Sequence, residues 1–115
     1  MLIAHSTIYL ANMPVDMRKS INGLSLLVIE SFNCNPTCGT YFVFCNRKKD
    51  KIKILYWDKN GFALWYKRLE KSTFQFAHQS DGKALVTSEQ LQWLLSGLDY
   101  QSMKKIDELN YDIFQ

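Results

Sequence analysis

The sequence predicts an α+β fold: a mainly antiparallel, twisted β-sheet in the form of a β-meander, with two to three helices packed against it. Three observations support this prediction. Apolar residues recur at spacings of three and four over residues 17–32, which is typical of a helix with one buried face. Three β-rich segments then follow with only short polar turns between them, and a helix-capping sequence begins at Thr87.

Length and composition fit one domain. The chain has 115 residues, of which 47% are hydrophobic and 22% are charged, so it can bury one core but not two. We expect a single α+β domain over residues 1–98 and a C-terminal tail over 99–115 that is either helical or partly disordered. No apolar run is long enough to span a bilayer and no signal peptide is recognisable, so no membrane contact is expected.

The first predicted elements are a strand over 3–10 and a helix over 17–32. Residues that favour β-structure fill the strand segment, which ends before a turn at Met13 and Pro14. Asp16 is expected to cap the helix. The buried stripe of this helix is expected to consist of Met17, Ile21, Leu24, Leu27, Val28 and Phe32.

The middle of the chain predicts a meander of three strands over 40–46, 51–57 and 62–69, joined by polar turns. Further short strands are expected over 73–77 and 83–86. Because the turns of the meander are short, its strands should pair in chain order and antiparallel.

A short amphipathic helix is predicted over 88–96. Thr87 and Gln90 match a capping box, in which the hydroxyl of the first residue and the amide of the second satisfy free backbone N–H groups. Gly97 is expected to help end this helix.

Strand alternation separates the meander into two faces. The first is almost wholly apolar and is expected to pack on the helices; it carries Tyr41, Val43, Cys45, Ile52, Ile54, Tyr56, Ala63, Trp65 and Lys67. The second is split into an apolar end and a basic end. We predict a protein interface at the apolar end, which is exposed unless the segment around Phe74 and Phe76 or the tail covers it. That interface consists of Phe42, Leu55, Trp57, Phe62 and Leu64.

The basic end of the second face is a predicted DNA-binding strip. The net charge is only +3, but the positive charge is concentrated in the middle of the chain. In one register of the second turn Lys53 lies opposite Arg68, a like-charge pair that phosphates would neutralise, beside Tyr66 for stacking. Alternatively, Lys51 pairs with Glu70 while Lys53 and Arg68 extend into solvent. The strip consists of Arg47, Lys51, Lys53, Tyr66 and Arg68.

No catalytic site, metal site or cofactor is predicted. Asp16, Asp58 and Glu70 invite comparison with the acidic triad of nucleases, but each has a local role as a helix cap, turn residue or strand-end partner. The histidines, serines and cysteines lack a recognisable catalytic context, and the glycines form no phosphate-binding loop.

The cysteines indicate a reducing compartment. Cys34, Cys38 and Cys45 are an odd number, which disfavours a disulfide framework and favours a cytoplasmic location. The spacing of the first two could offer two thiolates to zinc, but neither His5 nor His78 lies at a paired-ligand spacing. We therefore expect reduced thiols.

Several of these segments, in this order, resemble a known family. They are Val15-Asp16-Met17-Arg18-Lys19 with Gly23-Leu24, Phe42-Val43-Phe44 with Asn46-Arg47, Lys51-Ile52-Lys53-Ile54-Leu55-Tyr56-Trp57-Asp58 with Gly61, and Trp65-Tyr66-Lys67-Arg68-Leu69-Glu70. Together they resemble the TnpB proteins, products of the second open reading frame of IS66-type insertion sequences. The resemblance runs from about residue 13 to residue 98.

The resemblance implies a non-catalytic accessory role in DNA transposition, beside a separate and larger transposase. The expected partners are the transposase of the same element and DNA, bound with low sequence specificity; self-association into a homo-oligomer is a further possibility. Two alternatives stay open at this point: a protein-interaction adaptor that makes no DNA contact, and a metal-dependent nuclease.

Overall fold

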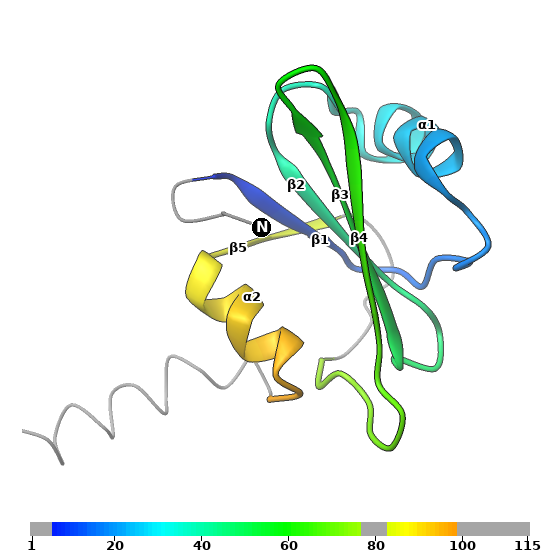
Figure 1. Cartoon of the computed structure of the whole chain (residues 1–115), viewed down its shortest axis with the longest axis vertical. Coiled ribbons are helices and arrows are strands. Elements are labelled where there is room, and N and C mark those ends of the chain that lie inside the picture. Colours follow the sequence, from blue (N-terminus) through cyan, green and yellow to red (C-terminus); the bar gives the residue numbers. More distant parts are fainter. Residues whose placement is uncertain (1–5, 77–82, 99–115) are drawn as a thin grey trace, which may run out of the picture.

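The computed structural model describes residues 6–76 and 83–98, and it shows a five-stranded sheet between two helices (Figure 1). The strands are β1 (Ile8–Ala11), β2 (Tyr41–Cys45), β3 (Lys51–Asp58), β4 (Gly61–Arg68) and β5 (Lys83–Val86), and the helices are α1 (Ile21–Phe32) and α2 (Ser88–Leu95). The α+β class is confirmed. Neither described helix is long and apolar enough to cross a membrane.

The sheet is mixed, with the strand order β4-β3-β2-β1-β5. β1 and β2 run parallel, whereas the other three neighbouring pairs are antiparallel. The parallel pair arises because α1 connects the two strands as a crossover, and a crossover returns the chain in its original direction. The carboxyl ends of β1 and β2 therefore lie at the same edge of the sheet.

The predicted meander is present as β2, β3 and β4. In the last hairpin Lys53 pairs with Tyr66, and Lys51 pairs with Arg68. The register that places Lys53 opposite Arg68 is therefore wrong by two residues. A shift of two residues leaves every side chain on its expected face, because the side-chain period of a strand is two.

The start of α1 differs from the prediction. The helix begins at Ile21 after Ser20, whose side chain makes no capping hydrogen bond. Asp16 does not cap it; its carboxylate accepts hydrogen bonds from the backbone N–H and the guanidinium of Arg18. A local turn of this kind competes with helix formation, which explains the later start.

The segment over 73–76 is not the expected strand, and Ala77 lies outside the described residues. The backbone N–H of Phe74 donates to the carbonyl of Lys49, so the segment lies against a turn and does not continue the sheet. Phe74 and Phe76 are 1% and 6% exposed. Their rings thus fill the core in place of forming a strand.

The C-terminal predictions are confirmed for the described residues. β5 and α2 form where expected, and both hydrogen bonds of the capping box are present between Thr87 and Gln90, at 3.1 Å and 2.9 Å. Gly97 has a φ of 83°, a left-handed conformation that glycine adopts without strain and that follows the end of the helix.

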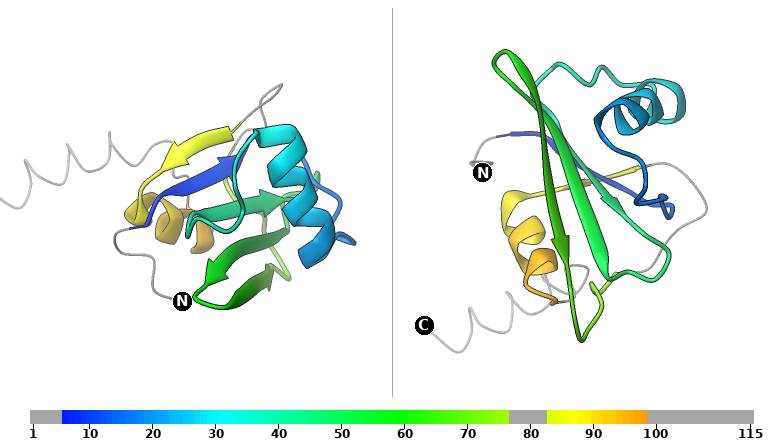
Figure 2. Two further views of the ribbon diagram at one scale, coloured as in Figure 1. Left: turned by 90° about the horizontal axis from the view of Figure 1, so that it is seen from above. Right: turned by 45° about the vertical axis from the view of Figure 1, so that its right-hand side comes forward.

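The two helices cover opposite faces of the sheet (Figure 2). α2, with Phe74 and Phe76, packs on the face of the meander that was expected to contact both helices. α1 packs on the other face through Leu24, Val28 and Phe32. The expectation that the helices pack on the first face is thus wrong for α1, because the crossover carries this helix over the second face.

This arrangement buries the centre of the predicted protein interface. Phe42 is 1% exposed and Leu55 is 0% exposed, so neither can form an exposed patch. Phe62 and Leu64 are partly buried against the same cluster, and Trp57 contacts Phe62 edge-on, with ring centroids 5.0 Å apart. The apolar end of this face mainly holds α1 on the sheet.

Replacing Leu55 by alanine should lower the free energy of unfolding by about 2–5 kcal/mol, because it leaves a cavity beneath α1. Leu85→Ala is the matched control: Leu85 is 68% exposed, and its loss should change stability by about 0.5 kcal/mol or less. Urea unfolding followed by circular dichroism measures both. A Leu55→Ala variant that kept its stability but lost a self-associated state would show instead that Leu55 lies in an interface.

Candidate functional site

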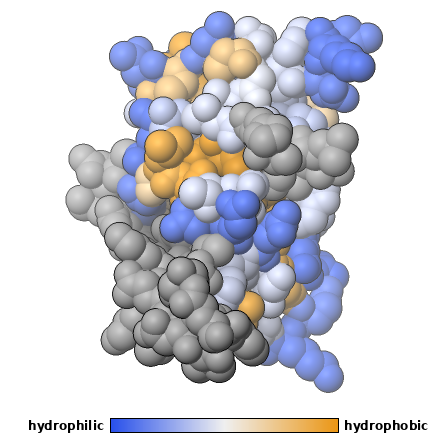
Figure 3. All heavy atoms as spheres, turned by 90° about the vertical axis from the view of Figure 1, so that its left-hand side faces the viewer, coloured by the Kyte–Doolittle hydropathy of each residue, from blue (hydrophilic) through white to orange (hydrophobic). Residues whose placement is uncertain are grey.

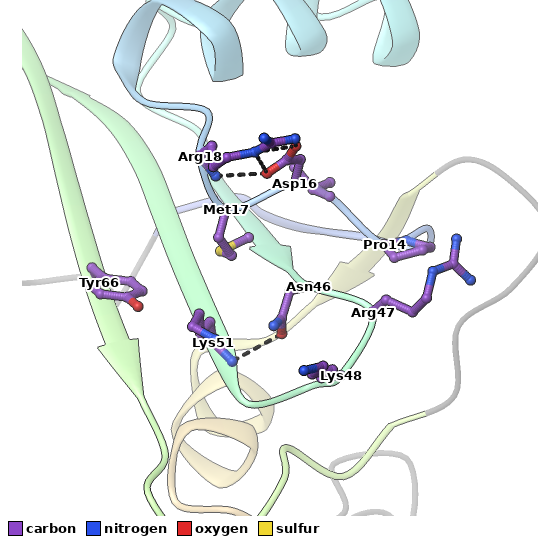
Figure 4. Close-up of a pocket in the computed structure, with 10 residues that line it drawn as sticks. Pro14, Asp16, Met17, Arg18, Asn46, Arg47, Lys48, Lys51 and Tyr66 are labelled. Atoms are coloured by element: carbon purple, nitrogen blue, oxygen red, sulfur yellow. Dashed lines mark hydrogen bonds and ion pairs between the residues drawn. The ribbon is translucent and has the colours of Figure 1, made fainter.

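A hollow of about 620 Å³ lies where the loops after the parallel strands β1 and β2 come together (Figure 4). Adjacent parallel strands place the loops that follow them at one edge, where concave binding sites commonly form. We call this feature the basic hollow. Its lining residues are Pro14, Val15, Asp16, Met17, Arg18, Asn46, Arg47, Lys48, Lys51 and Tyr66.

Three hydrogen bonds hold the first loop against the sheet. The backbone N–H of Val15 donates to the carbonyl of Cys45 at 2.9 Å. The ammonium of Lys53 donates to the backbone carbonyls of Met17 at 2.7 Å and Lys19 at 2.8 Å. The loop before α1 is thereby joined to both β2 and β3, and it forms one wall of the basic hollow.

The turn between β2 and β3 forms another wall, and Asn46 organises it. Its side-chain oxygen accepts hydrogen bonds from the backbone N–H groups of Asp50 at 3.1 Å and Lys51 at 3.0 Å. Its amide donates to the Asp50 carboxylate at 2.6 Å. Asparagine commonly stabilises turns in this way. Arg47 and Lys48 therefore occupy the tip of an ordered turn, and both are exposed.

The charge of the basic hollow is positive, because its lining includes four cationic side chains and a single carboxylate. That carboxylate belongs to Asp16 and forms an ion pair with Arg18, with a nitrogen–oxygen distance of 2.7 Å. The hydrogen bonds from Arg18 lower the pKa of Asp16 to about 2. Lys51 lies 3.4 Å from the Asp50 carboxylate. Over residues 6–76 and 83–98, Arg47 and Lys48 form no ion pair, so they carry most of the uncompensated charge.

Tyr66 provides the aromatic wall. It extends from β4 toward the space beside Met17 and Lys51, on the side opposite to Arg47 (Figure 4). Tyr66 is 48% exposed, which is high for a large apolar residue. The Lys53 ammonium lies 5.6 Å from the ring centroid, a cation–π contact that helps to hold the ring in place.

The structure brings together only part of the predicted DNA-binding strip. Arg47, Lys51 and Tyr66 line the basic hollow. Lys53 does not, because its ammonium is used to hold the loop before α1. Arg68 pairs with Glu70 at 3.0 Å on the exposed end of β4. This pair also shows that the alternative pairing of Glu70 with Lys51 is wrong.

Two lining cations were absent from the predicted strip, namely Arg18 and Lys48. Both belong to segments that the sequence had singled out for other reasons. Arg18 lies in the first segment of the family resemblance, and Lys48 lies in the basic turn that joins two strands. Strand alternation does not reach either residue, since it assigns faces only to residues within strands; of the turn between β2 and β3, only Arg47, next to the strand end, had been included in the strip.

The acidic residues that were weighed as a nuclease triad lie apart. Asp16 is bound to Arg18, and Glu70 is bound to Arg68. Asp58 pairs with Gly61 at the far end of the last hairpin, more than about 20 Å from Glu70 at the usual rise per strand residue. Over the residues that the structure describes, no group of three or more histidine, cysteine or acidic side chains is placed to hold a metal ion.

The three cysteines are free and differ in environment. Burial raises the pKa of the Cys45 thiol to about 12, so this thiol stays protonated and unreactive at neutral pH. Cys38 is exposed, and a hydrogen bond with the Thr40 hydroxyl lowers its pKa.

Fold and site together define a small mixed α+β domain with a basic hollow at the carboxyl ends of its parallel strands. The chain belongs to the family described as IS66 Orf2 like protein, which it matches over residues 6–105. This span is wider than the 13–98 over which the resemblance was recognised. The protein is therefore a transposition-associated accessory protein of an IS66-type insertion sequence.

Two relatives come from Sinorhizobium fredii (strain NBRC 101917 / NGR234). The uncharacterized protein y4jC is 37% identical over 85% of this chain and 84% of its own length. The uncharacterized protein y4hO is 33% identical over 82% of each chain. No solved structure matches the chain.

Replacing Lys53 by methionine should lower the free energy of unfolding by about 1–3 kcal/mol, because two carbonyls lose a charged hydrogen-bond donor. Methionine keeps the apolar stem, so the change isolates the ammonium. Lys71→Met, at an exposed position, is the control and should be nearly neutral. Equal effects of the two variants in urea unfolding would show that water satisfies both carbonyls.

The carboxyl group of Asp16 should titrate near pH 2 in the folded protein, below its ordinary value of 3.8. Because the folded-state pKa is lowered, the stabilisation from ionised Asp16 is present above pH 3.8 and is lost as the pH falls through about 2. Carbon-detected NMR of the carboxyl measures the midpoint. Arg18→Met should move it back toward 3.8, and a parent midpoint already at that value would contradict the pairing.

Proposed function

We propose that this protein is a non-catalytic accessory subunit of transposition that binds the DNA backbone through the basic hollow while acting beside the transposase of the same element. The observation that carries the proposal is the position of Arg47 and Lys48. Both side chains are exposed at the tip of an ordered turn and form no ion pair among the described residues, whereas Arg18 is paired with the Asp16 carboxylate. Free cations beside Lys51 and Tyr66 suit an anionic polymer.

The expected binding mode is electrostatic. Cations that contact phosphates release condensed counterions, so affinity should fall steeply as salt increases. Phosphate contacts carry no direct sequence information, and the protein alone should therefore bind DNA of many sequences. Recognition of the element's ends would then fall to the transposase. The free cysteines suit a reducing compartment such as the cytoplasm.

A non-catalytic role is supported by the way the acidic side chains are used. Two-metal phosphoryl chemistry needs carboxylates within a few ångströms of one another. Asp16 and Glu70 are each paired with an arginine, and Asp58 lies at the opposite end of the hairpin from Glu70. This arrangement favours binding over cleavage.

A protein-interaction adaptor is the second candidate, and the outer side of α1 favours it. Leu26 and Ile29 are 52% and 51% exposed and lie three residues apart on one helix, so they form a small apolar ridge. Of the predicted interface, Trp57, Phe62 and Leu64 stay partly exposed. Figure 3 shows the side of the molecule away from α1, where a separate apolar area is bordered by hydrophilic residues. A transposase could pack on such surfaces without any contact to DNA.

Reversing the charges at the tip of the turn, with Arg47→Glu and Lys48→Glu, should weaken binding to a labelled duplex at least about tenfold at low salt. Lys59→Glu with Lys71→Glu is the matched control: it changes the net charge by the same amount at exposed positions outside the basic hollow. Fluorescence anisotropy over a salt series gives the affinities, and circular dichroism checks the fold.

Equal losses in the two double variants would mean that net charge, and not the basic hollow, attracts DNA. A parent protein with no affinity at low salt would make the adaptor the better explanation. In that case, pull-down of the transposase with the parent and with Ile29→Asp tests the ridge on α1.

A further inference from the structure

The shape of the basic hollow bears on which form of DNA it accepts. Its volume of about 620 Å³ falls within the roughly 300–1,000 Å³ typical of sites for small ligands. An intact duplex is a convex cylinder, and its stacked bases are enclosed by two backbones. A duplex can reach the cations of the hollow through its phosphates, but its paired and stacked bases are not free to stack on Tyr66. A single nucleotide is small enough to enter.

The chemistry of the two sides fits the two ends of a nucleotide. Tyr66 lies on one side, and Arg47 and Lys48 lie on the other, with Lys51 between them (Figure 4). A nucleotide likewise carries an aromatic base and a charged phosphate at opposite ends of its sugar. An exposed aromatic ring accepts any base by stacking, while lysine and arginine follow the backbone.

The ring of Tyr66 is both supported by the protein and exposed to solvent, as stacking on a base requires. It stands on a paired strand, opposite Lys53, and it is 48% exposed. The Lys53 ammonium that contacts the ring is itself tied to the carbonyls of Met17 and Lys19. The strand position and the contact with Lys53 orient the ring before a base arrives, which favours stacking on it.

We propose that the basic hollow binds an unpaired nucleotide of DNA, with the base stacked on Tyr66 and the adjoining phosphates on Arg47, Lys48 and Lys51. This inference rests on the proposed function and adds to it a preference for single strands and for duplex ends with an unpaired overhang. Such DNA arises wherever strands are cut or opened during transposition. The protein would hold these strands without reading their sequence.

The test compares three labelled ligands of the same sequence by fluorescence anisotropy at one salt concentration: a single strand, a blunt duplex and a duplex with an unpaired overhang. The parent should bind the single strand and the overhang at least about fivefold more tightly than the blunt duplex. Tyr66→Leu keeps an apolar side chain but removes the ring. It should lose this preference, so that the single strand and the overhang bind no more tightly than the blunt duplex. Tyr66→Phe, which keeps a stacking ring, should retain the preference.

Melting curves of the two Tyr66 variants check that both are folded, and the parent's own preference tests the inference without any substitution. Equal affinity of the parent for the three ligands would overturn it, as would an unchanged preference in Tyr66→Leu. In both cases the proposed function survives if Arg47→Glu with Lys48→Glu still weakens duplex binding. Absence of binding to all three ligands would instead refute both proposals.

Discussion

The ammonium group of Lys53 connects the main parts of this structure. From the first half of β3 it donates hydrogen bonds to the carbonyls of Met17 and Lys19, in the loop that leads into α1. It also contacts the ring of Tyr66. Charge-assisted hydrogen bonds are stronger than neutral ones, so this one side chain holds the loop, directs the entry of α1 and supports a wall of the basic hollow.

The crossover between β1 and β2 explains why a hollow forms at this edge. Parallel strands end at the same edge, so the loop before α1 and the turn after β2 must both begin there. Each has its own internal hydrogen bonds: Arg18 donates to Asp16 in the first, and Asn46 donates to Asp50 in the second. The hydrogen bond from Val15 to the carbonyl of Cys45 fixes the first loop to the end of β2, where the second begins. The two ordered loops leave a concave space, and the antiparallel β4 closes its far side through Tyr66.

Positive charge on this protein has two uses that composition cannot distinguish. Lys53 and Arg18 are engaged by protein groups, the first by carbonyls and the second by a carboxylate, and both support the loop before α1. Arg47 and Lys48 are held at the surface by the turn that contains them. Only charges of the second kind are available to an anionic partner without a loss of structure.

The sequence by itself determined the local structure: the strands of the meander, their two faces, the capping box at Thr87 and the family. These depend on periodicity and on residues within a few positions of one another, which can be read along the chain. Only the tertiary structure decided that α1 covers Phe42 and Leu55, and that the Lys53 ammonium hydrogen-bonds the loop before α1. The carbonyls that bind Lys53 are 36 and 34 residues away in sequence. No local pattern reports such a contact, because it exists only once the crossover has placed α1 on the sheet.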